Sequence, residues 1–151
     1  MRFVRLALGL FAVAMGGCGV ITAPTEESRL SAARRVWNAA KLSDYRYEVR
    51  SVCECLQGGR WIAVTVVEGT VRSGTFLDTE TPVETLYLVA LPTVPALFDR
   101  IQHAINQSAV LVEAEYDPSD GHPLLINVNG SPVIADDEFS VYTRNLGVLR
   151  R

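Results

Sequence analysis

The feature that most constrains this chain is a run of strict two-residue alternation that begins at Tyr45. Apolar or small side chains recur at every second position through residue 55: Tyr45, Tyr47, Val49, Ser51, Cys53 and Cys55. The intervening positions are charged, except for Val52: Arg46, Glu48, Arg50 and Glu54. Successive side chains of a strand point to opposite faces. The run therefore predicts a strand with one buried and one solvated face, which is typical of an antiparallel sheet.

Five further strands are predicted from alternation and from content of β-branched residues. They are residues 60–67, 70–77, 110–116, 124–129 and 139–144. Turn-forming residues separate them, most densely in "DPSDGHP" at 117–123. Residues 78–92 show no clear pattern and are expected to form a long connection containing a short strand or a turn of helix.

Two helices are predicted from apolar residues spaced three and four apart. The first starts after Ser28 as N-cap, and its stripe is Leu30, Ala33, Trp37 and Ala40. The second covers residues 94–107, with Thr93 as N-cap and Pro95 in its first turn. The expected order is α-β-β-β-α-β-β-β. The fold class is therefore α+β, with two helices packed on one face of an antiparallel sheet of about six strands.

The N-terminus predicts export. Arg2 and Arg5 precede an apolar run at 6–15, and Gly16-Gly17 follows, as in a secretory signal. The run is about ten residues, too short to cross a hydrocarbon core of about 30 Å as a helix. A buried N-terminal core helix is the alternative.

The segment "MGGC" resembles the lipobox of bacterial lipoproteins, which places lipid on Cys18. Met15 stands where that motif usually has Leu. Cleavage after residues 12–14 is the alternative and would leave Cys18 as a thiol. The resemblance predicts a signal peptide at 1–17, a lipid-anchored tether at 18–27 and one α+β domain at 28–151. Gly19 rather than Asp after the cysteine implies, in a bacterium with two membranes, the outer membrane facing the periplasm. The cell surface is the alternative.

Charge excludes one class of partner. The whole chain has 14 basic and 17 acidic residues. Without Arg2 and Arg5 the balance is 12 against 17, a net charge of −5. No basic stripe is present of the kind that neutralises phosphates. Nucleic acid is therefore not an expected partner.

The spaced pair Cys53 and Cys55 permits several chemistries. In a regular strand their Cα atoms would lie about 6.6 Å apart, at the upper limit for a disulfide, so a bridge needs a kinked or bulged strand. On the chain-entropy estimate, so small a loop stabilises by only about 1.6 kcal/mol. A local disulfide or paired buried thiols, thiol exchange and a soft-metal clip all remain open. The remaining histidines, His103 and His122, are expected on a solvated helix face and in a turn.

The acidic turns offer a cation site as a further hypothesis. Asp117, Asp120 and Gly121 suggest a Ca²⁺ loop, but Val128 occupies the position where the EF-hand pattern requires Glu. Asp136 and Asp137 would join Asp117 and Asp120 if the two loops met at one sheet edge. Solvated turns are the simpler interpretation.

Several motifs together resemble a family of small bacterial lipoproteins whose domain is of unknown function. They are the helix ending in Trp37, "YRYEV" with the spaced cysteines (45–55), "LFDRIQHAI" (97–105), "VEAEYDPSDGHP" (112–123) and "DDE" (136–138). The resemblance implies an envelope location and an α+β domain. It assigns no catalytic residue.

The sequence contains no nucleophile–base–acid set, zinc-protease motif or phosphate-binding glycine loop. A non-enzymatic, lipid-anchored binding or structural domain without a cofactor is therefore expected, with an envelope protein or small ligand as partner. A thiol-redox or metal-handling lipoprotein using Cys53 and Cys55 is the first alternative. An inhibitor of a secreted hydrolase is the second, and it rests on analogy of architecture alone.

Overall fold

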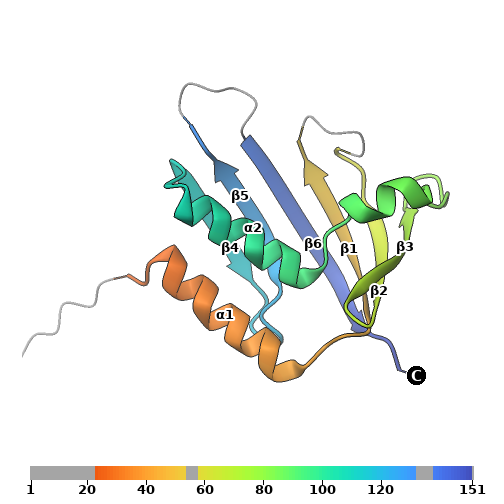
Figure 1. The fold of residues 1–151 in the computed structure, drawn as a ribbon, viewed down its shortest axis with the longest axis horizontal. Helices are drawn as coiled ribbons and strands as arrows, with labels where there is room; N and C mark the ends of the chain where they lie inside the picture. Colours follow the sequence, from red (N-terminus) through yellow and green to blue (C-terminus); the bar gives the residue numbers. More distant parts are fainter. Residues whose placement is uncertain (1–22, 54–57, 132–137, 151) are drawn as a thin grey trace, which may run out of the picture.

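A computed structural model describes residues 23–53, 58–131 and 138–150 of the chain. Within these ranges six strands form one sheet, with two α-helices and a short 3₁₀-helix beside it (Figure 1). All neighbouring strands are antiparallel. The predicted α+β class and six-stranded antiparallel sheet are confirmed. None of the helices in the described ranges has the length and apolar character needed to cross a bilayer.

The first and last strands lie together at the centre of the sheet. The strands are β1 Tyr45–Val52, β2 Ile62–Val67, β3 Thr70–Phe76, β4 Leu111–Tyr116, β5 Pro123–Asn129 and β6 Glu138–Val148. Their spatial order is β3-β2-β1-β6-β5-β4. Arg50 of β1 pairs with Tyr142 of β6, and Glu48 pairs with Arg144. This register decides which side chains become neighbours on the two faces of the sheet.

Helix α1, Glu26–Ala40, starts earlier than predicted. Its N-cap is Thr25, whose hydroxyl oxygen accepts a hydrogen bond from the Ser28 backbone N–H at 3.2 Å. The prediction of Ser28 as N-cap is therefore wrong, and the end of the expected tether belongs to the helix and its cap. Glu26 and Glu27 in the first turn favour this start, because acidic side chains stabilise the positive end of the helix dipole.

Helix α2, Val94–Asn106, agrees closely with the prediction. The Thr93 hydroxyl accepts a hydrogen bond from the Ala96 backbone N–H at 3.3 Å, and Pro95 lies in the first turn. The apolar stripe is buried as expected: Val94, Leu97, Phe98, Ile101 and Ala104. His103 lies off this stripe and is exposed.

Two tyrosines of β1 connect the sheet to the start of α2. Tyr45 and Tyr47 are almost completely buried. The Tyr45 hydroxyl accepts from the Val94 backbone N–H at 2.9 Å, and the Tyr47 hydroxyl donates to the Pro92 carbonyl. The Trp37 ring of α1 meets the Tyr45 ring edge-on, with centroids 5.3 Å apart. Aromatic packing and hydroxyl bonds thus hold both helices against the same face of β1.

The prediction that two helices pack on one face of the sheet is incomplete, because a third element also covers part of the sheet. Helix α1 packs on α2 and β4, and α2 also packs on β4 and β5. The opposite end of the sheet is covered by the 3₁₀-helix η1, Thr85–Ala90, which packs on β3 (Figure 1). This element lies in the segment 78–92 that showed no clear pattern.

Close packing beside η1 depends on the missing side chain of Gly74. A Cβ at this position would lie 2.6 Å from Leu91 Cδ1 and 3.0 Å from Val83 Cγ2. The Val83 backbone N–H also donates to the Gly74 carbonyl at 2.8 Å. Val83 and Leu91 are buried, so the segment contributes to the core although its pattern is neither helical nor strand-like.

Candidate functional site

The two faces of the sheet carry different side chains. Tyr45, Tyr47 and Val49 of β1 are buried beneath the helices. The alternate residues Arg46 and Arg50 point to the opposite face, which no described helix covers. We call this second surface the open face. The predicted alternation of β1 is confirmed as far as Val52.

A stacked group of aromatic and guanidinium side chains lies on the open face. The Arg50 guanidinium carbon lies 4.7 Å from the Tyr142 ring centroid and 5.2 Å from the Trp61 ring centroid. The Arg144 guanidinium carbon lies 4.0 Å from the same Trp61 centroid. Arg50 and Tyr142 meet because they are directly paired across β1 and β6. Trp61 immediately precedes β2, the strand on the other side of β1.

The two arginines of this group differ in their partners. Arg144 Nε donates to Glu48 Oε2 at 2.7 Å, forming an ion pair. Although burial acts to raise the pKa of Glu48, the hydrogen bond from Arg144 holds that pKa below its ordinary value. Arg50 Nε is buried and has no hydrogen-bond partner. Within the described ranges, Arg50 forms no ion pair either.

The charge of the open face changes from one side to the other. The strands β1 and β6 contribute Arg46, Arg50 and Arg144 against Glu48 and, at the start of β6, Glu138. The edge strand β4 contributes exposed Glu113 and Glu115, separated from the arginines by β5. A basic region therefore lies over the centre of the sheet and an acidic region along one edge.

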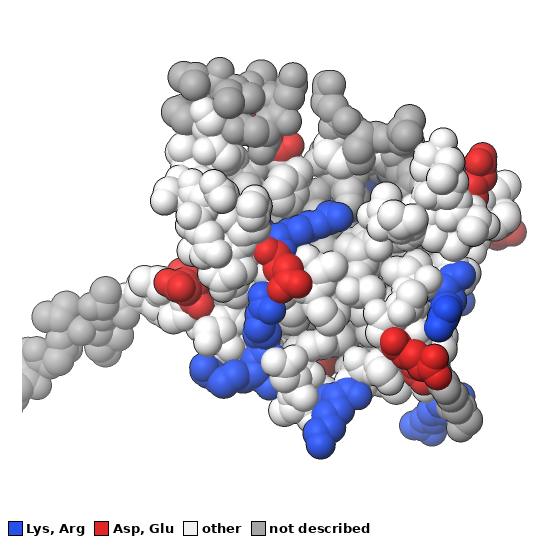
Figure 2. All heavy atoms as spheres, viewed as in Figure 1, with Lys and Arg blue, Asp and Glu red and all other residues white. Residues whose placement is uncertain are grey.

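The helix side shows a different distribution of charge. Figure 2 shows basic and acidic side chains interspersed there. Arg34 of α1, for example, forms a 2.9 Å ion pair with Asp99 of α2. Arg60 and Asp78 form another at 2.6 Å. Such neutralised pairs give this side no evident feature for selecting a charged ligand.

Cys53 does not lie where the sequence predicts. Strand β1 ends at Val52, and Cys53 is a half-buried bend residue after it. The prediction that the strand continues through Cys53 is therefore wrong. Cys53 has an interaction partner in the structure, and Cys55 lies outside the described residues. Cys18 lies outside them as well.

A shallow hollow of about 550 Å³ lies beside Cys53. Its lining comes from the ends of β1, β4, β5 and β6 and includes Val52, Leu111, Asn129 and Phe139. No titratable pair suited to acid–base chemistry lines it among the described residues, where Glu138 is the one carboxylate.

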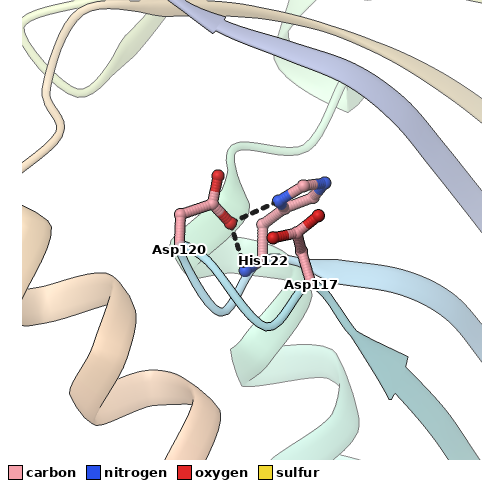
Figure 3. A group of neighbouring side chains, drawn as sticks. All are labelled: Asp117, Asp120 and His122. Carbon is pink, nitrogen blue, oxygen red and sulfur yellow. Dashed lines mark hydrogen bonds and ion pairs between the residues drawn. The ribbon is translucent and has the colours of Figure 1, made fainter.

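Asp117, Asp120 and His122 form a compact group in the turn between β4 and β5 (Figure 3). One potential ligand atom from each lies within 4.8 Å of the others. The other two predicted candidates, Asp136 and Asp137, lie outside the described residues. His122, which was expected simply to lie in a turn, is instead the buried member of the group, with 4% of its surface exposed. A turn of this composition gave no signal of burial.

Hydrogen bonds within the turn account for most of this arrangement. Asp120 Oδ1 accepts from the His122 backbone N–H at 2.9 Å and lies 2.5 Å from His122 Nδ1. Asp117 Oδ1 accepts from the hydroxyl and the backbone N–H of Ser119, and these bonds lower the pKa of Asp117. The second ring nitrogen, His122 Nε2, is buried and has no hydrogen-bond partner among the described residues. The hydrogen bonds stabilise the turn, which packs against α1 through Gly121.

A model of a family of unknown function (DUF6174) matches residues 29–148 of the chain. The match includes α2 and all six strands, and all but the first turn of α1. No curated protein and no solved structure matches the chain.

Proposed function

The chain belongs to the family of unknown function DUF6174, and we propose that it is a non-catalytic binding domain of the bacterial cell envelope, anchored to a membrane by lipid on Cys18. The observation that carries the binding role is the open face, where Arg50 is held between two aromatic rings without a charged partner among the described residues. A polar side chain that is held in one conformation and has no partner in the protein can bind a complementary group of a ligand.

The described residues offer little support for catalysis. His122 is buried against Asp120, and His103 is exposed on α2 without a neighbouring nucleophile. A general base must reach the proton that it removes within hydrogen-bond distance. Neither histidine meets that condition with a serine, threonine or cysteine nucleophile in the described ranges. Turnover abolished by one point substitution would contradict the proposed role.

The binding role is tested by site-specific photocrosslinking in the native envelope. A benzoylphenylalanine at position 46 places the crosslinker on the open face. The same residue at position 35 places it on the exposed side of α1. We expect a discrete adduct from position 46 and none from position 35. Adducts of equal yield at both positions, or at position 35 alone, would contradict the open face as the binding surface.

The membrane anchor has an independent test. The segment "MGGC", the short apolar run and the two N-terminal arginines support lipidation. Intact-mass measurement on the membrane fraction should show acyl mass on the parent chain, and Cys18→Ser should lose both that mass and membrane retention. Several acyl chains at about 0.8 kcal/mol per buried CH₂ are sufficient to retain a small domain. Equal masses for the two chains after signal removal would exclude the anchor.

A second candidate function uses Cys53 and Cys55 for thiol exchange or soft-metal handling. The bend at Cys53 favours it, because a regular strand would keep the two sulfur atoms too far apart. Free-thiol titration of the folded protein under mild reductant distinguishes the two candidates. Thiols that become accessible only after unfolding would exclude the redox role.

A further inference from the structure

Arg50 has an unusual set of neighbours for a charged side chain. Its guanidinium lies near two aromatic rings, Tyr142 at 4.7 Å and Trp61 at 5.2 Å. Its Nε is buried and makes no hydrogen bond. The nearby carboxylate of Glu48 is already bound to Arg144. The positive charge of Arg50 is therefore fixed in position but not neutralised by any described residue.

This arrangement preorganises the Arg50 guanidinium to bind an anion. Stacking on aromatic rings limits the orientations of the planar guanidinium, so less conformational entropy is lost when it binds a ligand. Arg46 adds a second positive charge on the same face, and it has no ion pair among the described residues. With three arginines against Glu48 and Glu138, the part of the open face formed by β1 and β6 has a net positive charge although the whole chain is acidic.

The surroundings favour an isolated carboxylate over a polyanion. Nucleic acids and anionic bilayers present closely spaced charges, which require a continuous basic stripe. Here the basic region is short, and Glu113 and Glu115 on β4 would repel a polyanion that extended across β5. Sugar stacking on Trp61 is disfavoured because the Arg144 guanidinium already lies 4.0 Å from the ring centroid.

The rest of the open face fits an extended chain. Beside Tyr142 and Arg144, β6 presents Ser140, and the neighbouring strand β5 presents Asn127 in direct register with it. The Ser140 hydroxyl can donate and accept hydrogen bonds along a bound polypeptide, and the Asn127 side-chain oxygen can accept them, while Asn127 Nδ2 donates to Glu113 Oε2 at 3.5 Å. We propose that Arg50, held between Trp61 and Tyr142, binds a carboxylate of an acidic peptide segment lying on the open face. This inference rests on the proposed role of that face as the binding surface.

The test uses the full chain and a displayed library of random peptides. Selected peptides should be enriched in Asp and Glu relative to the starting library. Arg50→Gln should weaken their binding by about tenfold or more, because a charge-assisted hydrogen-bonded pair is lost. Arg50→Lys should also weaken it, since lysine keeps the charge but cannot form the bidentate contact. Arg35→Gln, the same charge change on α1, should leave binding unchanged.

A second measurement does not depend on the Arg50 variants. Peptide binding to the unmodified chain should change the fluorescence of Trp61, and Trp61→Phe should remove that change while Trp37 remains. Thermal unfolding of each variant checks that the fold is retained.

Four results would overturn the inference. The selection could give no peptide, or peptides without enrichment in Asp and Glu. Arg50→Lys could bind the peptides as tightly as the parent chain, or the chain could bind phosphatidylglycerol vesicles through Arg50 and bind no peptide. If the position-46 adduct persists in Arg50→Gln, the open face remains the binding surface and only the carboxylate inference fails. If position 46 gives no adduct at all, the proposed function itself fails.

Discussion

Aromatic residues lie on both faces of the sheet at β1, but their surroundings differ between the helix side and the open face. On the helix side, the hydroxyls of Tyr45 and Tyr47 both have backbone partners, and the rings are enclosed. On the open face, Tyr142 and Trp61 flank a guanidinium whose Nε has no hydrogen bond. On the helix side, the aromatic residues thus make their hydrogen bonds within the protein. On the open face, they flank a guanidinium nitrogen that has no hydrogen-bond partner. The difference indicates where the fold is stabilised and where a ligand can be recognised.

The largest difference in stability between the two faces should appear when one aromatic ring is removed from each face. Tyr47→Ala should lower the free energy of unfolding by about 3–5 kcal/mol, because it leaves a cavity and an unpaired Pro92 carbonyl. Tyr142→Ala, on the half-buried open face, should lower it by less than about 1 kcal/mol. Chemical denaturation of both variants measures the difference. Similar losses would show that the open face also carries the stability of the fold.

The turn that packs against α1 provides the next test of the helix side. Gly121 has φ +81°, and a Cβ there would lie 2.3 Å from the Ala33 carbonyl oxygen. Gly121→Ala should therefore lower the free energy of unfolding by about 2–4 kcal/mol through backbone strain and a steric clash. Gly59 has φ +80°, and an added Cβ there would have no atom of the described residues within 4 Å, so Gly59→Ala reports the backbone cost. Equal melting temperatures for the two variants would contradict the close contact with α1.

The stability of the fold should depend on pH through a buried tyrosine on the helix side of β1. Burial raises the pKa of Tyr45 from 10.0 to about 12, opposed by its bond to Val94. The unfolded chain therefore loses this proton at lower pH than the folded chain. The stability linked to Tyr45 is complete below pH 10 and is lost as the pH rises to about 12. Tyr45→Phe should make the fall of the denaturation midpoint in this range less steep, and the rest of the fall should persist because burial also raises the pKa values of Tyr47 and Tyr116. An unchanged slope in the variant would exclude Tyr45 as its cause.

The smallest effect on stability is expected on the open face. Glu48→Gln removes a partly exposed ion pair and should change the free energy of unfolding by less than about 0.5 kcal/mol. The same change releases Arg144 and should strengthen binding of the selected acidic peptides. Denaturation and peptide titration on one preparation measure both. Weaker peptide binding would instead indicate that Glu48 contacts the ligand.

The sequence predicted the parts of this fold whose patterns are local. Alternation identified the strands, and Thr93 with its apolar stripe identified α2. The start of α1 was misplaced because Thr25 and Ser28 are both good N-caps, and only the first accepts the capping bond. The segment 78–92 was expected to contain a short strand or a turn of helix, and η1 is such a turn, but its position could not be predicted because it lacks a helical stripe, with Leu86 and Val89 75% and 88% exposed.

The candidate site could not be predicted from local sequence patterns. Arg50 lies on β1, Tyr142 lies on β6 and Trp61 immediately precedes β2, and they meet only because β1 lies between β2 and β6. Pairing of the first strand with the last cannot be read from periodicity. The burial of His122 was missed for a related reason, since the turn becomes enclosed only through its contact with α1.

The central position of β6 has a consequence for how the protein forms. Without residues 138–148, β1 and β5 would each end a separate half-sheet, with unpaired backbone N–H and C=O groups along one edge. The final strand supplies hydrogen-bonding partners to both edges at once. The sheet therefore cannot close until residues 138–148 have been synthesised, and loss of this strand would divide the domain through its middle.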